Sequence, residues 1–188
     1  VRYERGAVMP GVRPMETSYT VYDPACRRWS PWDTVRMPDP ERYFNSGSSG
    51  GQRVDLEDGE ILQPIHFRPR PSVAPSEGSS RPSEGDGSDV SPGADPWNQK
   101  IDARTAVMRC RFDGSVLECL EVGPSITVSG GRGLLEPSLR RFGDRFYLTI
   151  RNNLRGYIAT SDDGMRFTPP EPWCWDDGTE VPTDNTQH

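Results

Sequence analysis

The sequence predicts an all-β fold, and three observations lead to this prediction. Only 32% of the 188 residues are hydrophobic. The chain contains 19 glycines and 19 prolines, which interrupt long helices. Short segments rich in apolar and β-branched residues recur between Gly and Asp turns, a pattern typical of strands joined by hairpins. A domain built from many short strands is therefore expected.

The strand pattern is found on both sides of a polar region. Residues 18–32 (SYTVYDPACRRWSPW) predict two strands around an acidic turn, and residues 59–67 (GEILQPIHF) predict one strand. Farther along, two strand-like segments flank Asp113-Gly114, a pair that readily adopts the positive φ angles of tight hairpins. His66 alternates with its apolar neighbours, so we interpret it as a histidine of the sheet rather than a catalytic one.

Residues 68–98 consist almost entirely of proline, serine, glycine and acidic residues. Such a segment cannot bury enough apolar surface to offset the entropy lost on ordering. We predict a disordered insert that separates two parts of one β domain, residues 1–67 and residues 99–188. A mucin-like or partner-binding segment is the alternative interpretation.

A hairpin between residues 135 and 151 places a carboxylate beside a guanidinium. If Gly143 and Asp144 form a two-residue loop, the register puts Glu136 directly opposite Arg151. Directly opposed side chains on neighbouring strands are close enough to form an ion pair. The pair is either a structural cross-strand contact or part of a site at the strand ends.

The stretch SDDG, residues 161–164, lies between a strand and an aromatic residue, Phe167. Serine and aspartate side chains can bond the backbone of their own turn, and glycine supplies the unusual φ angle. We therefore interpret Asp162 and Asp163 as turn residues rather than catalytic ones.

Composition excludes several classes of function. The net charge of −6 with scattered arginines disfavours a nucleic-acid partner. The four cysteines form no C-x-x-C pair and only two histidines are present, so no zinc site is expected. No apolar run is long enough for a membrane span.

The chain starts at Val1 without a leader and stops in a loop-like segment, so we expect a piece of a longer protein.

Several blocks of the chain resemble the sialidase-like six-bladed β-propellers, in particular a bacterial branch of exo-α-sialidases. In order, the blocks are GGQRVDLEDGEILQPIHF, FDG, RGLLEPSLRRFGDRFYLTIRNNLRGYIATSDDG, PWCWDDG and DNTQH. SDDGMRF resembles the aspartate box (Asp-box) of that family. The resemblance covers residues 52–188 apart from the insert and implies a β-propeller of which about three blades are present.

The resemblance also implies site residues. Sialidases hold the substrate carboxylate with three arginines and attack with a tyrosine that a glutamate activates. By position, Glu136 is similar to that glutamate and Arg151 to the middle arginine, which makes them the catalytic candidates. The tyrosine and the third arginine are expected beyond His188. Further candidates for binding the substrate are side chains in neighbouring loops, Gln52, Asn152, Arg155 and Gln187.

The sequence thus predicts a glycoside hydrolase, a neuraminidase-like enzyme of carbohydrate metabolism that removes a terminal sialic acid or a related acidic sugar from a glycan. No cofactor and no metal ligand is assigned, and metal dependence is left open. The resemblance favours a secreted or periplasmic location. Two alternatives remain open: a five-bladed arabinanase or glycoside-phosphorylase type of enzyme, and a propeller that binds glycans without turnover.

Overall fold

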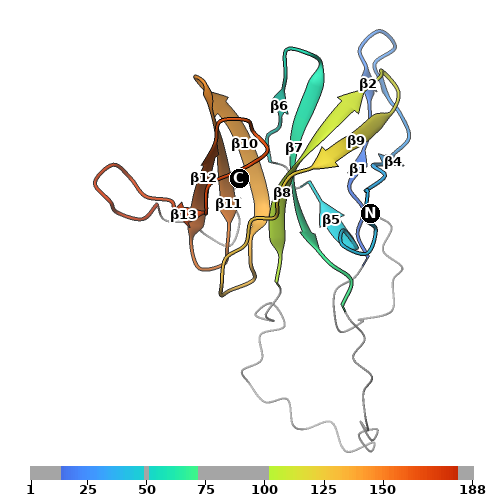
Figure 1. The fold of residues 1–188 in the computed structure, drawn as a ribbon. Helices are drawn as coiled ribbons and strands as arrows, with labels where there is room; N and C mark the ends of the chain where they lie inside the picture. The colour runs from blue at the N-terminus through green and yellow to red at the C-terminus, as the bar shows by residue number, and fades with distance from the viewer. Residues whose placement is uncertain (1–13, 49–50, 72–101, 182–188) are drawn as a thin grey trace, which may run out of the picture.

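The computed structural model describes residues 14–48, 51–71 and 102–181, and in these ranges its regular structure consists of β-strands without any helix (Figure 1). This confirms the all-β prediction. The predicted insert of residues 68–98 lies outside the described residues except for residues 68–71. No helix that is long and apolar enough to cross a membrane occurs in the described part of the chain.

The N-terminal part forms a long, narrow hairpin of four two-residue strands, confirming the predicted pair of strands around an acidic turn. The outer strand pair is β1–β4 and the inner pair is β2–β3. The Asp23 carboxylate accepts the Ala25 N–H at 2.8 Å inside the turn, as an Asx-turn requires. The strands are β1 (Ser18–Tyr19), β2 (Tyr22–Asp23), β3 (Arg28–Trp29) and β4 (Asp33–Thr34).

A central sheet follows, with the strand order β5-β7-β8-β9, and β6 pairs with the first half of β7. Pro64 sits in the middle of β7 without breaking it. Its partner Val107 directs its carbonyl to Gly123, so the side of Pro64 that lacks an N–H faces the gap between β5 and β6. The strands are β5 (Asn45–Gly47), β6 (Val54–Asp55), β7 (Glu60–Arg68), β8 (Arg104–Phe112) and β9 (Leu117–Val122).

The C-terminal sheet is an antiparallel meander whose strands follow one another in chain order, β10-β11-β12-β13. Gly143 and Asp144 form the two-residue loop that the sequence predicts, and Gly143 has a φ of 60°. From Ser138 to Phe142 the register is the predicted one. The strands are β10 (Leu135–Phe142), β11 (Arg145–Arg151), β12 (Gly156–Ser161) and β13 (Glu171–Pro172).

One part of the predicted register is wrong. A β-bulge between Leu135 and Ser138 shifts the pairing, so that Leu135 rather than Glu136 lies opposite Arg151. Proline at position 137 explains the irregularity, because it has no N–H to contribute to a regular ladder. The bulge leaves the rest of the hairpin in register.

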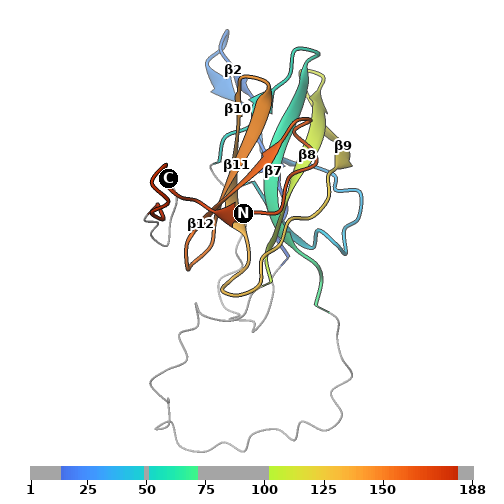
Figure 2. The ribbon, with the colours of Figure 1, turned by 60° about the vertical axis from the view of Figure 1, so that its left-hand side comes forward.

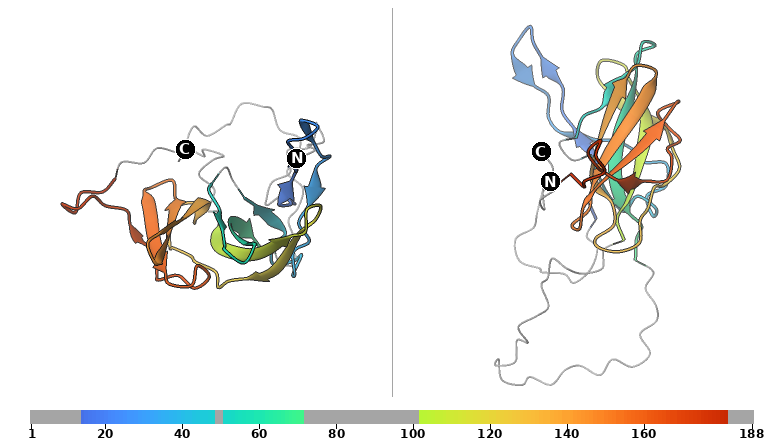
Figure 3. Two further views of the ribbon diagram at one scale, coloured as in Figure 1. Left: turned by 90° about the horizontal axis from the view of Figure 1, so that it is seen from above. Right: turned by 90° about the vertical axis from the view of Figure 1, so that its left-hand side faces the viewer.

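Two apolar clusters lie on opposite faces of the central sheet and hold the three parts together. β10 packs across β7, and Figure 2 shows β10 beside β7. Seen from above, the C-terminal sheet, the central sheet and the N-terminal hairpin follow one another side by side (Figure 3). The cluster between the two sheets contains Leu62, Val107, Ile126, Leu134, Leu139, Phe146, Leu148, Ile150 and Met165. The cluster on the other face, toward the N-terminal segment, contains Val35, Tyr43, Ile61, Ile65, Phe67, Ala106, Met108 and Cys110.

The turn after β12 is built as the sequence predicts. The Ser161 hydroxyl accepts the Gly164 N–H at 2.9 Å, and the Asp163 carboxylate accepts the Met165 and Arg166 N–H groups at 2.8 and 2.7 Å. Gly164 has a φ of 73°, and a Cβ there would lie 2.4 Å from Leu62 Cδ1. No strand follows the turn directly, since β13 begins only at Glu171. Phe167 instead packs against the cluster between the sheets.

Replacing Asp163 by alanine is expected to lower the free energy of unfolding by about 1.5 kcal/mol, because the turn N–H groups lose their acceptor. Burial alone would raise the pKa of Asp163, but the N–H groups of Arg166 and Met165 and the Ser161 hydroxyl lower it to about 2. This is below the unfolded value, so the carboxylate stabilises the fold above pH 4, and its contribution disappears as the pH falls from about 4 to 2.

Urea unfolding of the chain at several pH values measures this effect. Asp162→Ala is the matched control. Among the described residues, Asp162 forms one ion pair, with the exposed Arg145 at 3.4 Å, and its loss is expected to cost under ~0.5 kcal/mol. Equal stabilities of the two variants at pH 7 would contradict the role assigned to Asp163.

Candidate functional site

The candidate site is formed where β10 begins, at the bulge. Glu136 has a φ of 46°, in the left-handed region that residues other than glycine rarely occupy. Backbone strain of this kind persists only where neighbouring structure enforces it, and it is frequent at functional sites. Here the neighbour is Gly51, where a Cβ would lie 2.0 Å from the Pro137 carbonyl oxygen. Glycine at position 51 therefore allows another segment to lie directly against the bulge.

Glu136 and Arg151 form a two-point ion pair despite the shifted register. Arg151 Nη2 donates to Glu136 Oε1 at 2.7 Å, and Arg151 Nε lies 2.7 Å from Oε2. The side chain of Arg151 is 7% exposed and that of Glu136 is 28% exposed. The predicted contact is confirmed, although the bulge rather than direct opposition produces it. A fork-like guanidinium held in this way has a fixed orientation.

Two further arginines and a histidine lie at the same end of the sheets. Alternation along β7 puts His66 and Arg68 on the face that carries Leu62, and Leu62 packs against the C-terminal sheet. Arg132 lies in the turn before β10, where its N–H is bonded to Asn153 Oδ1 at 2.8 Å. β7 therefore directs His66 and Arg68 toward the beginning of β10.

This end of the described structure carries excess positive charge. No described carboxylate forms an ion pair with Arg68 or Arg132, and the Nε atom of each is buried without a hydrogen-bond partner among the described residues. Burial, and then the positive charge of Arg132, lowers the pKa of Arg68 to about 10, so the Arg68 guanidinium is still charged at neutral pH. In a chain of net charge −6, this local excess favours an anionic ligand.

His66 stays neutral at pH 7. Burial is the main cause that lowers its pKa to about 4, Arg68 acts in the same direction, and Glu136 opposes the shift. His66 also lines a cavity of about 320 Å³ together with side chains from the N-terminal segment and β5, namely Met15, Glu16, Thr17, Ser18, Trp32, Gly47 and Ser48. His66 is thus the one described residue of this cavity's lining that also belongs to the charged end of the sheets.

The structure gives Gln52 and Asn152 supporting positions, Gln52 along β10 and Asn152 directly after Arg151. The backbone of Gln52 runs along β10, accepting the Leu139 N–H at 2.9 Å and donating to Ser138 Oγ at 3.1 Å, while Gln52 itself is exposed. Asn152 is 2% exposed, and its Nδ2 donates to the carbonyls of Gly130 and Gly133 at 3.3 and 2.8 Å. Asn152 therefore holds the loop that leads into Glu136.

The structure does not bring Arg155 to the pair. Arg155 Nη1 instead lies 2.8 Å from Glu180 Oε1 in an exposed ion pair. Gln187 lies outside the described residues.

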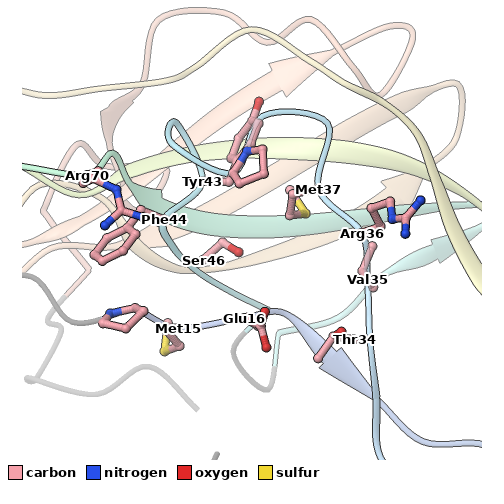
Figure 4. Close-up of a pocket in the computed structure, with 12 residues that line it drawn as sticks. Met15, Glu16, Thr34, Val35, Arg36, Met37, Tyr43, Phe44, Ser46 and Arg70 are labelled. Carbon is pink, nitrogen blue, oxygen red and sulfur yellow. The ribbon is translucent and has the colours of Figure 1, made fainter.

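Another hollow lies beneath the N-terminal segment, with a volume of about 420 Å³ (Figure 4). Its lining is mostly apolar side chains and backbone, and Arg70 at its rim is paired with Glu41 and lies 4.1 Å from the centre of the Phe44 ring. The described lining residues include one carboxylate, Glu16, and no histidine or cysteine. This hollow has fewer convergent polar groups than the end of β10.

Sequence reasoning did not assign Arg68 and Arg132 to the site. Arg68 was placed in the insert, yet it is the last residue of β7 and pairs with Asn45 of β5. The period of two along residues 60–68 could have identified it, because it puts Arg68 and His66 on one face. Arg132 gives no such signal, since its position depends on the loop that Asn152 holds.

Among the described residues, no group of three or more His, Cys, Asp or Glu side chains could hold a metal ion. No family model matches the chain, and neither a curated protein nor a solved structure matches it.

Proposed function

We propose that this chain is part of a glycoside hydrolase that acts on a glycan ending in an acidic sugar, as the sequence resemblance to exo-α-sialidases suggests. The observation that carries the proposal is the two-point Glu136–Arg151 pair beside Arg68 and Arg132, neither of which has an acidic partner among the described residues. Guanidinium groups recognise a planar carboxylate through two parallel hydrogen bonds, so a sugar acid fits this charge distribution.

The proposed fold is a six-bladed β-propeller. In support of it, the C-terminal sheet is a four-stranded meander that is continuous in sequence, and its face packs on the central sheet through one apolar cluster. Such sheets, arranged around an axis, are the blades of propellers, whose sites lie at the ends of the strands. Glu136, Arg151 and Arg68 lie at strand ends.

In this proposal the residues have separate tasks. Arg68, Arg132 and Arg151 attract and orient the carboxylate of the sugar. Glu136 fixes Arg151 and takes the proton of an attacking tyrosine, which the resemblance assigns to another part of the protein. A neutral nucleophile suits an acidic sugar, because a second carboxylate would be repelled by the substrate. His66 is neutral and borders the bound sugar.

The protein encoded by the complete gene, incubated with a fluorogenic α-sialoside, tests the proposal. Release of the fluorophore with retention of configuration supports it. Turnover of an arabinoside alone would favour the five-bladed type of enzyme, and binding of N-acetylneuraminic acid without turnover would favour a glycan-binding propeller. Absence of both turnover and binding would contradict the acidic-sugar assignment.

Replacing Arg132 by glutamine is expected to weaken binding of N-acetylneuraminic acid about fivefold, since one charged donor is lost at the rim of the site. Isothermal calorimetry measures the affinity, and the methyl ester of the sugar should be insensitive to the change. Arg140→Gln is the matched control, because Arg140 is an exposed residue of the neighbouring strand β10. Equal losses for the two variants would indicate an effect of net charge alone.

A further inference from the structure

Two cysteines face each other across neighbouring strands of the central sheet. Cys110 of β8 and Cys119 of β9 are partners in the antiparallel ladder. The first part of this ladder has a register that would place Leu120 opposite Cys110, but a bulge between Arg109 and Cys110 moves the pairing by one residue. The irregularity thus creates the cysteine pair.

Both side chains belong to the same face of the sheet. Cys110 is fully buried in the cluster toward the N-terminal segment, and Cys119 packs against that cluster while remaining partly exposed. The ladder makes the two thiols cross-strand neighbours. Interaction with Cys110 lowers the pKa of the Cys119 thiol, and interaction with Cys119 is the main cause that raises the pKa of Cys110. Cys119 Sγ itself donates to the Glu121 carbonyl at 3.7 Å.

Directly opposed residues of an antiparallel pair match the spacing that a disulfide needs. Their Cα atoms are about 4.5 to 5.5 Å apart, within the range of about 4.4 to 6.8 Å found for disulfides. The other two cysteines, Cys26 and Cys174, are exposed on separate elements. We propose that Cys110 and Cys119 form a reversible cross-strand disulfide that fixes β9 to β8.

The reaction with oxidised glutathione follows from the exposure of the two groups. The Cys119 thiolate attacks one sulfur of oxidised glutathione, the glutathione S–S bond breaks, and one glutathione leaves as a thiol after taking up a proton. Cys110 then attacks the Cys119 sulfur of the mixed disulfide and releases the second glutathione. The two protein thiols are oxidised, and one oxidised glutathione is reduced to two thiols.

The disulfide would stabilise an outer strand at a contact with the N-terminal hairpin. β9 ends the strand order of the central sheet, and its first residue, Leu117, donates its N–H to the Tyr19 hydroxyl at 3.1 Å. Oxidation would therefore hold β9 against β8 near the contact between β9 and the N-terminal hairpin.

The test uses the chain with Cys26→Ser and Cys174→Ser, which leaves the buried cluster unchanged. The reduced protein is incubated with glutathione buffers of graded composition, quenched with acid, alkylated and weighed intact. We expect a monomer two hydrogen atoms lighter that takes up no alkyl group, and reversal by a phosphine reductant. The glutathione ratio at half oxidation should differ by tenfold or more between the native chain and the chain in urea, favouring the disulfide in the native chain.

The matched control is the chain with Cys110→Ser and Cys119→Ser, which keeps the two exposed cysteines and should still be alkylated twice or carry glutathione. The proposal is overturned if the Cys26→Ser, Cys174→Ser protein keeps two reactive thiols, retains bound glutathione or forms a linked dimer. Equal glutathione ratios in native and urea conditions would also overturn it, because the fold would then contribute nothing to the pairing.

Discussion

Replacing Arg151 by lysine is expected to lower kcat/KM for an acidic sugar substrate by about tenfold or more in the complete protein. Arg151 is 7% exposed and is oriented by two contacts with Glu136. An ammonium group cannot reproduce a planar two-point contact, and losing such a contact costs on the order of 1.5 to 3 kcal/mol of transition-state stabilisation. Steady-state kinetics with a fluorogenic sialoside measure the change.

Arg145→Lys is the matched control for this experiment. Arg145 begins the same strand, β11, but its side chain is 56% exposed, and within the described part of the chain its ion pair is with Asp162. Its substitution should leave kcat/KM within about twofold of the parent value. If Arg151→Lys and Arg145→Lys have the same kinetics, Arg151 does not contact the substrate.

Replacing Glu136 by glutamine is expected to lower the free energy of unfolding by about 2 kcal/mol. Removing one member of a buried ion pair leaves the other charge desolvated and unpaired, which costs about 3 to 5 kcal/mol for fully buried pairs. The side chain of Glu136 is 28% exposed, so solvent screening reduces the effect. Urea unfolding at neutral pH measures the loss.

Two comparisons separate the ion pair from other effects of this substitution. Asp162→Asn removes one partner of the exposed pair with Arg145 and should cost less than ~0.5 kcal/mol. Adding Arg151→Met to Glu136→Gln should recover part of the lost stability, because the unpaired charge is then absent. If the free energy cost of Arg151→Met is the same in the parent chain and in the Glu136→Gln variant, the two side chains do not interact.

The hairpin of β10 and β11 shows what alternation and turn chemistry can predict. The Gly143-Asp144 loop determines the pairing as far as Ser138. The Glu136–Arg151 contact predicted from that register does form, but the bulge that produces it was not predicted. Local interactions also determine the turn at Asp163. Both features depend on residues that are close together in the sequence.

Contacts between distant segments could not be predicted in the same way. The bulge at Glu136 depends partly on Gly51, which lies against Pro137 from another part of the chain. Arg68 lies at the site because β10 packs across β7. The periodicity of a local sequence segment cannot predict this packing between distant strands. Sequence reasoning therefore found the pair on one hairpin and missed the arginines that tertiary structure adds to it.

The central sheet has an apolar cluster on each face, and this arrangement bears on cooperativity. Residues that alternate along β7 and β8 belong to different clusters: Leu62 and Val107 to one, Ile61 and Met108 to the other. Separating either neighbour would expose one face of the same two strands. The stability of the N-terminal hairpin is thus coupled to that of the C-terminal sheet through the central sheet that both pack against. Repeat proteins behave in the same way, since a repeat affects distant repeats through those that lie between them. A substitution that destabilises the hairpin therefore affects the Glu136–Arg151 pair by lowering the stability of the central sheet between them.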